Sequence, residues 1–172
     1  REEDKGLYEE TASNKKAQDL KKRCSLINEG QADCAVSIHQ NSYQDSEVYG
    51  PQVFYYEDSA QGKELAELIQ KELNTGLEVA RPRVAKGNKT YYLLKRSESV
   101  LNIVECGFLT NQEEAGLLQQ EEYQQKAADI CRKHNIDAVV VIGGDGSYKG
   151  ARNLRNHDIN TISMPGTIDL DI

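Results

Sequence analysis

Two polar residues stand at the ends of apolar runs, where a buried strand would deliver them to the edge of a sheet. His39 follows the run at residues 35–38, and Glu105 follows the run at residues 101–104. An imidazole nitrogen can hold zinc, and a carboxylate can deprotonate a water molecule bound to the metal. Together the two residues fit a metal hydrolase. Taken singly, each also fits a polar residue at the point where a strand surfaces.

The sequence around these two residues resembles the zinc-dependent N-acetylmuramoyl-L-alanine amidases of bacterial cell walls. The similarity covers residues 1–128 and is carried by three stretches in the order and spacing of that family: Ser-Ile-His-Gln-Asn at 37–41, Gly-Pro-Gln-Val-Phe-Tyr-Tyr at 50–56 and Val-Glu-Cys-Gly-Phe-Leu-Thr-Asn at 104–111. The resemblance implies that the chain acts on peptidoglycan, with His39 as a zinc ligand and Glu105 as the catalytic acid/base. Thr110 stands where the family usually has serine.

The family's zinc site has two further ligands that do not occur in the sequence. They are a histidine in an Asp-Pro-Gly-His-Gly-Gly loop and a glutamate on the helix that follows. The opening at Arg1 resembles the end of the family's second strand, so we expect the segment with these ligands to lie before the first residue. We therefore expect weak zinc binding and no measurable turnover from the chain as printed, because zinc affinity comes from three or four ligands together.

A different pattern begins near residue 129. The β-branched run at residues 138–142 leads into the glycine-rich sequence at residues 143–147, the order of a phosphate-binding strand, loop and helix. Glycine lets backbone amides approach an anion, and a helix amino terminus attracts it. With Pro-Gly-Thr-Ile-Asp-Leu-Asp-Ile at residues 165–172, this part resembles ATP-dependent 6-phosphofructokinase. Leu170 replaces the family's usual asparagine, and Ser163 stands where glycine is common.

The second resemblance implies a site for Mg-ATP and a sugar phosphate. Nucleotide phosphates would be contacted by Gly144, Asp145, Gly146 and Ser147, magnesium by Asp145 and Asp171, and the sugar by Thr167 and Asp169. Asp169 would also accept the proton of the attacking hydroxyl. The family's amino-terminal glycine-rich loop and its second lobe are missing, so we expect no kinase activity from residues 129–172.

The two patterns predict an α/β protein with a mixed or mostly parallel sheet and flanking helices, a truncated amidase fold, plus a carboxyl-terminal βαβ-type fragment. The amidase-like part spans residues 1–128, and the phosphofructokinase-like fragment spans residues 129–172. A fusion of gene fragments, an engineered recombinant and an assembly artefact each explain the join. Four functions stay open: zinc amidase, sugar-phosphate kinase fragment, non-enzymatic chimera and peptidoglycan-binding remnant. The first part would act in the cell envelope or outside the cell, and the second in the cytoplasm.

Composition restricts the partners of the chain. It has 172 residues, of which 38% are hydrophobic and 28% charged, and a formal net charge of -7, as in many soluble globular proteins. We expect no nucleic-acid partner, because such binding needs a basic face. No apolar run approaches the length of a membrane helix, and no signal peptide is visible. The cysteines lack metal-site spacing, so we expect buried thiols without a structural disulfide, at Cys24, Cys34, Cys106 and Cys131.

Periodicity and capping residues predict the elements that position the candidate site. A helix is expected from Ser13 or Asn14 to Gly30. A second is expected after Asp58 or Ser59, with an apolar stripe of Leu65, Leu68, Ile69 and Leu73. A short turn capped by Asn111 is expected at 112–118, and a closing helix around Tyr123, Ala127 and Ile130. Strands are expected at 33–39, 52–56, 90–94, 99–106, 138–142 and 161–164. The basic stretch 81–89 is expected to be a solvated loop, with contact to substrate carboxylates as the alternative.

A sheet without its first strand has an open edge with unpaired backbone groups. One hypothesis is that the apolar run at residues 138–142 docks at this edge, which would bring Asp145 towards His39. The alternative is that residues 135–172 form a loosely attached βαβ appendage.

Overall fold

The computed structural model describes residues 8, 9, 11, 13–120, 122, 123, 125, 126 and 129, and the backbone of residues 138–143 and 160–165. Four strands form one sheet: β1 (Cys34–Asn41), β2 (Gln52–Tyr56), β3 (Lys86–Asn88) and β4 (Val100–Phe108). Their order is β1-β4-β2-β3, and β4 runs parallel to β1 but antiparallel to β2. The mixed sheet with flanking helices confirms the predicted α/β class.

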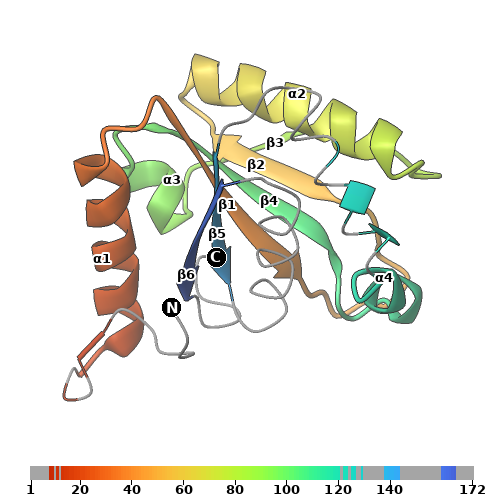
Figure 1. Ribbon diagram of the computed structural model, residues 1–172, viewed down its shortest axis with the longest axis horizontal. Helices are drawn as coiled ribbons and strands as arrows, with labels where there is room; N and C mark the ends of the chain where they lie inside the picture. The colour runs from red at the N-terminus through yellow and green to blue at the C-terminus, as the bar shows by residue number, and fades with distance from the viewer. Residues whose placement is uncertain are drawn as a thin grey trace.

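Helices cover both faces of this sheet (Figure 1). On one face, α1 (Lys15–Glu29) and α3 (Tyr92–Arg96) pack against Phe54, Leu101 and Ile103. On the other, α2 (Ala60–Gly76) packs against Val53 and Val104. Because side chains alternate along a strand, consecutive residues of β4 serve the two cores in turn. A fourth helix, α4 (Gln112–Leu117), follows β4 directly. Within the described residues, no helix has the length and apolar content to cross a bilayer.

Helix α1 begins and ends as the sequence predicts, and it also buries an ion pair. Asn14 Oδ1 accepts a hydrogen bond from Ala17 N at 2.9 Å, and the helix ends at Gly30. Leu20, Cys24 and Ile27 face the core. One turn apart on the same helix, Arg23 Nη2 lies 2.6 Å from Asp19 Oδ2, and the Arg23 side chain is 0% exposed. A charged pair with almost no exposed surface is unusual, because burial removes the hydration of both groups.

Helix α2 follows its predicted cap, and it follows its predicted apolar stripe in part, since Ile69 and Leu73 pack against the core. Ser59 Oγ accepts from Gly62 N at 2.9 Å, as expected. Leu68, however, is 57% exposed, whereas Gln70 is buried. The Gln70 amide accepts from Val53 N at 2.9 Å and donates to Pro51 O at 3.0 Å. A buried amide with satisfied hydrogen bonds is tolerated, and here it ties the helix to the start of β2.

The predicted strand at residues 90–94 is wrong, because most of this segment belongs to helix α3. Asn88 Oδ1 accepts from both Thr90 N and Tyr91 N at 2.7 Å, which turns the chain out of β3. Asparagine side chains favour such turns over extended backbone. Leu93 then enters the core with no exposed surface. Part of the predicted loop at 81–89 is also ordered, since β3 pairs in parallel with β2.

Replacing Asn88 with alanine is expected to lower the free energy of unfolding by about 1–2 kcal/mol, since two backbone amides lose their acceptor. Asn88→Asp keeps an acceptor oxygen and is the matched control, expected to cost less than half as much. Urea titration followed by circular dichroism measures both variants. Equal stability of the alanine variant and the parent would contradict this explanation of the turn.

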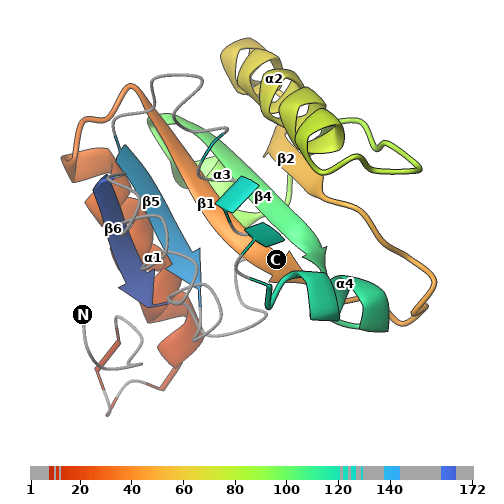
Figure 2. The same ribbon diagram turned by 45° about the vertical axis from the view of Figure 1, so that its right-hand side comes forward.

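Residues 138–143 and 160–165 contribute a separate two-stranded sheet. Strands β5 (Ala138–Gly143) and β6 (Asn160–Pro165) pair in parallel, which confirms both predicted strands. Strand β5 lies beside β1 (Figure 2). Among the described strands, however, it is hydrogen-bonded only to β6. The prediction that this run docks by strand pairing in the amidase sheet is therefore wrong. Strand β6 pairs with the backbone groups along one edge of β5, so β5 has a hydrogen-bonded neighbour without joining the sheet of β1.

Candidate active site

His39 and Glu105 are direct partners in the parallel β1–β4 ladder. In a parallel pair, partner residues project from the same face, and the carboxyl ends of both strands reach the same edge of the sheet. On the other side of β4, Gln52 of β2 is the partner of Glu105. The imidazole and the carboxylate that the sequence singled out are thus neighbours, although 66 positions separate them in the chain.

The surroundings of the pair restrict both side chains. Glu105 is 1% exposed, and His39 is half-buried. Ser37, two residues earlier on the same face of β1, is buried, and its Oγ lies 2.7 Å from His39 Nε2. This hydrogen bond orients the ring. Which atom donates depends on the tautomer of the imidazole. In the sequence, Ser37 stands out only as part of the Ser-Ile-His-Gln-Asn motif, which does not indicate its hydrogen bond to the histidine ring.

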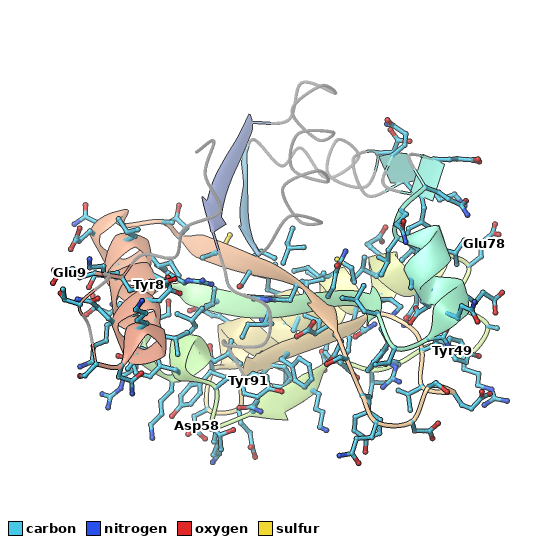
Figure 3. The ribbon with its side chains drawn as sticks, turned by 90° about the horizontal axis from the view of Figure 1, so that it is seen from below. Tyr8, Glu9, Tyr49, Asp58, Glu78 and Tyr91 are labelled. Atoms are coloured by element: carbon cyan, nitrogen blue, oxygen red, sulfur yellow. The ribbon has the colours of Figure 1, made fainter. Side chains whose placement is uncertain are left out.

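Two groups near Glu105 report a poorly hydrated, negatively charged environment. Burial, and then the charge of Glu105, raise the pKa of Tyr91. Burial, followed by the charges of Glu105 and Glu114, raises the pKa of Cys106 to about 12. Figure 3 shows Tyr91 on the side of the sheet where β3 lies. A carboxylate in such a place is sensitive to small changes in its neighbours, since electrostatic interactions strengthen as water is excluded.

The loop between β1 and β2 is tied to the corner between β4 and α4. Tyr43 N donates to Thr110 Oγ1 at 3.1 Å, and Asn111 Nδ2 donates to Ser46 O at 2.8 Å. Thr110 has a hydroxyl group, as the serine expected at this position would, and this hydroxyl accepts the bond from Tyr43 N. Asn111 also caps α4, as the sequence predicts.

The same corner holds a residue whose role the sequence did not reveal. Glu114 is 8% exposed, and its two carboxylate oxygens accept from Gly50 N and Phe108 N, each at 2.8 Å. The sequence offered only an acidic turn after a capping asparagine. In a solvated first turn, glutamate is common for helix-dipole reasons alone, so its burial was not foreseen. Figure 3 shows Tyr49, which precedes Gly50, close to α4.

A family model for N-acetylmuramoyl-L-alanine amidase matches residues 1–133. The chain belongs to this amidase family. The germination-specific N-acetylmuramoyl-L-alanine amidase of Bacillus subtilis is 38% identical over 121 residues, 70% of this chain and 51% of that protein. The CwlD amidase from Clostridioides difficile, solved in complex with the GerS lipoprotein, matches with a TM-score of 0.70 and 34% identity over 92% of this chain and 74% of that one.

The second resemblance is confirmed over a shorter stretch. An ATP-dependent 6-phosphofructokinase of Lactobacillus helveticus is 60% identical over 53 residues, 31% of this chain and 17% of that enzyme. The chain thus spans about half of the curated amidase and about a sixth of the curated kinase. The residues assigned to the kinase-like site lie outside the described part of the chain: Gly144, Asp145, Gly146, Ser147, Thr167, Asp169 and Asp171. Their roles, and the approach of Asp145 to His39, stay predictions.

The described residues include His39, which the sequence predicts to be a zinc ligand. An imidazole and a carboxylate are donor types that zinc takes, and the amidase register places them together. The described part of the chain has no group of three histidine, cysteine, aspartate or glutamate side chains that could hold a metal. A catalytic zinc normally has three protein ligands. The metal would therefore need ligands besides those that the structure describes.

The thiols match their prediction only in part. Cys24 is buried, and burial raises its pKa, followed by the charge of Glu98. Cys34 is exposed, contrary to expectation, because it opens β1 at the surface. Cys24, Cys34 and Cys106 are free thiols, and Cys131 lies outside the described residues, as do Ala127 and Ile130 of the predicted closing helix. Tyr123 of that helix is helical.

Proposed function

We propose that this protein is a peptidoglycan hydrolase that cleaves the amide bond between the lactyl group of muramic acid and L-alanine. Its site would contain His39 as a zinc ligand and Glu105 as acid/base. The observation that carries the proposal is the register of β1 and β4, which makes these two residues neighbours at one edge of the sheet. Residues 1–128 would form the hydrolase domain, acting in the cell envelope or outside the cell.

The chemistry divides between the two residues. Zinc, when bound, would polarise the scissile carbonyl and lower the pKa of the attacking water. Glu105 would take a proton from that water and deliver it to the amide nitrogen that leaves as the L-alanine amine. Its burial suits this task, because a desolvated carboxylate is a stronger base than a hydrated one. Ser37 would hold the His39 ring in position through the hydrogen bond to Nε2.

The test combines zinc binding with hydrolysis of purified sacculi, in a form of the protein that carries all its zinc ligands. His39→Ala is expected to lower zinc affinity at least about tenfold and to abolish release of free L-alanine amino groups, since a ligand is lost. Cys34→Ala, at an exposed residue of the same strand, is the control for general changes in β1. Unchanged zinc affinity in His39→Ala would contradict the assignment of that residue.

A second candidate function concerns residues 129–172 alone. The 53-residue similarity to a phosphofructokinase favours a nucleotide-binding fragment, with Mg-ATP as ligand. Calorimetric titration of the chain with Mg-ATP tests it, with Asp145→Asn as the variant expected to weaken binding. Identical heats for the parent and this variant would contradict the candidate.

A further inference from the structure

The ladder between β1 and β4 carries one extra residue immediately after Glu105. His39 pairs with Glu105 and Asn41 with Phe108, so two steps along β1 correspond to three steps along β4. An extra residue of this kind is a β-bulge, which bends its strand and re-aims nearby side chains. The bulge therefore lies between Glu105 and Phe108, next to the candidate acid/base.

From these contacts we infer that Glu114 is a positioning residue for Glu105. One oxygen of its buried carboxylate accepts from Phe108 N, at the end of the bulge. The other oxygen accepts from Gly50 N, two residues before Gln52, which is the β2 partner of Glu105. Glu114 thus fixes β4 just after Glu105 and β2 just before the neighbour of Glu105. The bulge and the start of β2 are held by one side chain.

A carboxylate serves both bonds, whereas an amide would not. Two backbone N–H groups point at it, and a carboxylate offers acceptors at both oxygens. A glutamine would present one oxygen and one NH₂ group, so one of the two N–H groups would face another donor. Because both bonds are buried and involve an ionised acceptor, each is stronger than a neutral bond at the surface.

Contacts within α4 and with the bulge also hold Glu114 in place. Asn111 Oδ1 accepts from Glu114 N at 3.0 Å, which holds the first turn of α4. A Cβ atom placed on Gly107 would lie 3.1 Å from Glu114 Oε1 and 3.2 Å from its carboxyl carbon. Glycine therefore occupies the position of the bulge that faces the Glu114 carboxylate. Any larger residue there would push the carboxylate away from its donors.

Two variants test the role from opposite sides of the contact, each with a matched control. Glu114→Gln removes one acceptor, and Glu113→Gln makes the same change at an exposed residue of the same helix. Gly107→Ala presses a methyl group against the carboxylate without altering it. Gly116→Ala adds the same methyl group where nothing lies within 4 Å.

Amide hydrogen exchange and NMR spectra of the full chain give the readouts. We expect the Gly50 and Phe108 amides to exchange at least about tenfold faster in Glu114→Gln and Gly107→Ala, since a buried charge-assisted bond is lost or lengthened. The side-chain carboxyl ¹³C signal of Glu105 and the ring ¹⁵N signals of His39 should shift in both variants. The two controls should keep the parent's exchange rates and signals. A general loss of stability would not move these signals in molecules that remain folded.

The outcomes separate this role from the proposed function, on which its catalytic meaning rests. Faster exchange with unmoved Glu105 and His39 signals overturns the positioning role, and unchanged exchange overturns the contact itself. If Glu114→Gln fails to fold, Gly107→Ala alone decides. Failure of a form of the protein with all its zinc ligands to hydrolyse sacculi would contradict the proposed function, yet it would leave the exchange and NMR results unaffected.

Discussion

Glu105→Gln is expected to lower the rate of muropeptide hydrolysis about 10²- to 10⁴-fold, the usual effect of removing a general acid/base. The measurement uses a form of the protein with all its zinc ligands, as in the test of His39. Glutamine has nearly the same volume, so Glu105 can be replaced without leaving a cavity between His39 and Gln52. The loss should therefore fall on the chemical step, with little change in binding to sacculi.

Glu113→Gln serves as the control, because it alters an exposed carboxylate on α4 and should leave the rate unchanged within about twofold. Full activity of the Glu105 variant would show that the carboxylate neither takes nor delivers the proton. In that case the register of β1 and β4 would bring the two residues together for a reason other than catalysis.

Arg23→Met is expected to lower the free energy of unfolding by about 3–5 kcal/mol, because it leaves the Asp19 carboxylate buried without its cation. The pair is almost entirely removed from water, so solvent cannot replace the lost partner. Urea unfolding of the variant and the parent measures the difference. A loss of this size is a large part of the stability of a small domain.

The double replacement Asp19→Leu with Arg23→Met gives the decisive comparison. It removes both charges, and it should restore most of the lost stability, since an apolar pair of similar volume needs no hydration. The four proteins form a double-mutant cycle whose coupling energy isolates the ion pair. A single variant as stable as the parent would contradict the view that Arg23 compensates a buried charge.

Local patterns predicted most of the elements. Asn14, Ser59 and Asn111 each cap a helix at the expected place, because a cap depends on residues within one turn. Strands β1, β2, β4, β5 and β6 were visible as apolar runs. The sequence pattern also selected His39 and Glu105 as candidates. Their direct pairing follows from strand register, which a single sequence does not specify.

What the sequence did not reveal depends on side-chain hydrogen bonds and burial that apolar periodicity does not report. Asn88 turns the chain where the tyrosines and leucines that follow favoured a strand, so a side-chain bond outweighed propensity. Asp19, Arg23 and Glu114 are charged residues, of types that are almost never fully buried unless paired. Their burial requires partners that only the folded chain supplies, and for Glu114 the partners are Gly50 and Phe108.

The central place of β4 has a consequence for the order of folding. Of the four strands in its sheet, β4 is the last to leave the ribosome, yet β1 and β2 are bonded to each other only through it. The β1–β4 pairs join residues 66 or 67 positions apart, as from Cys34 to Val100. Such distant contacts slow folding, because closure of a long loop precedes any gain from pairing. Among the described strands of that sheet, β1 has no bonded neighbour until β4 is synthesised, so the β1 edge that β4 later covers stays open for longer in the nascent chain.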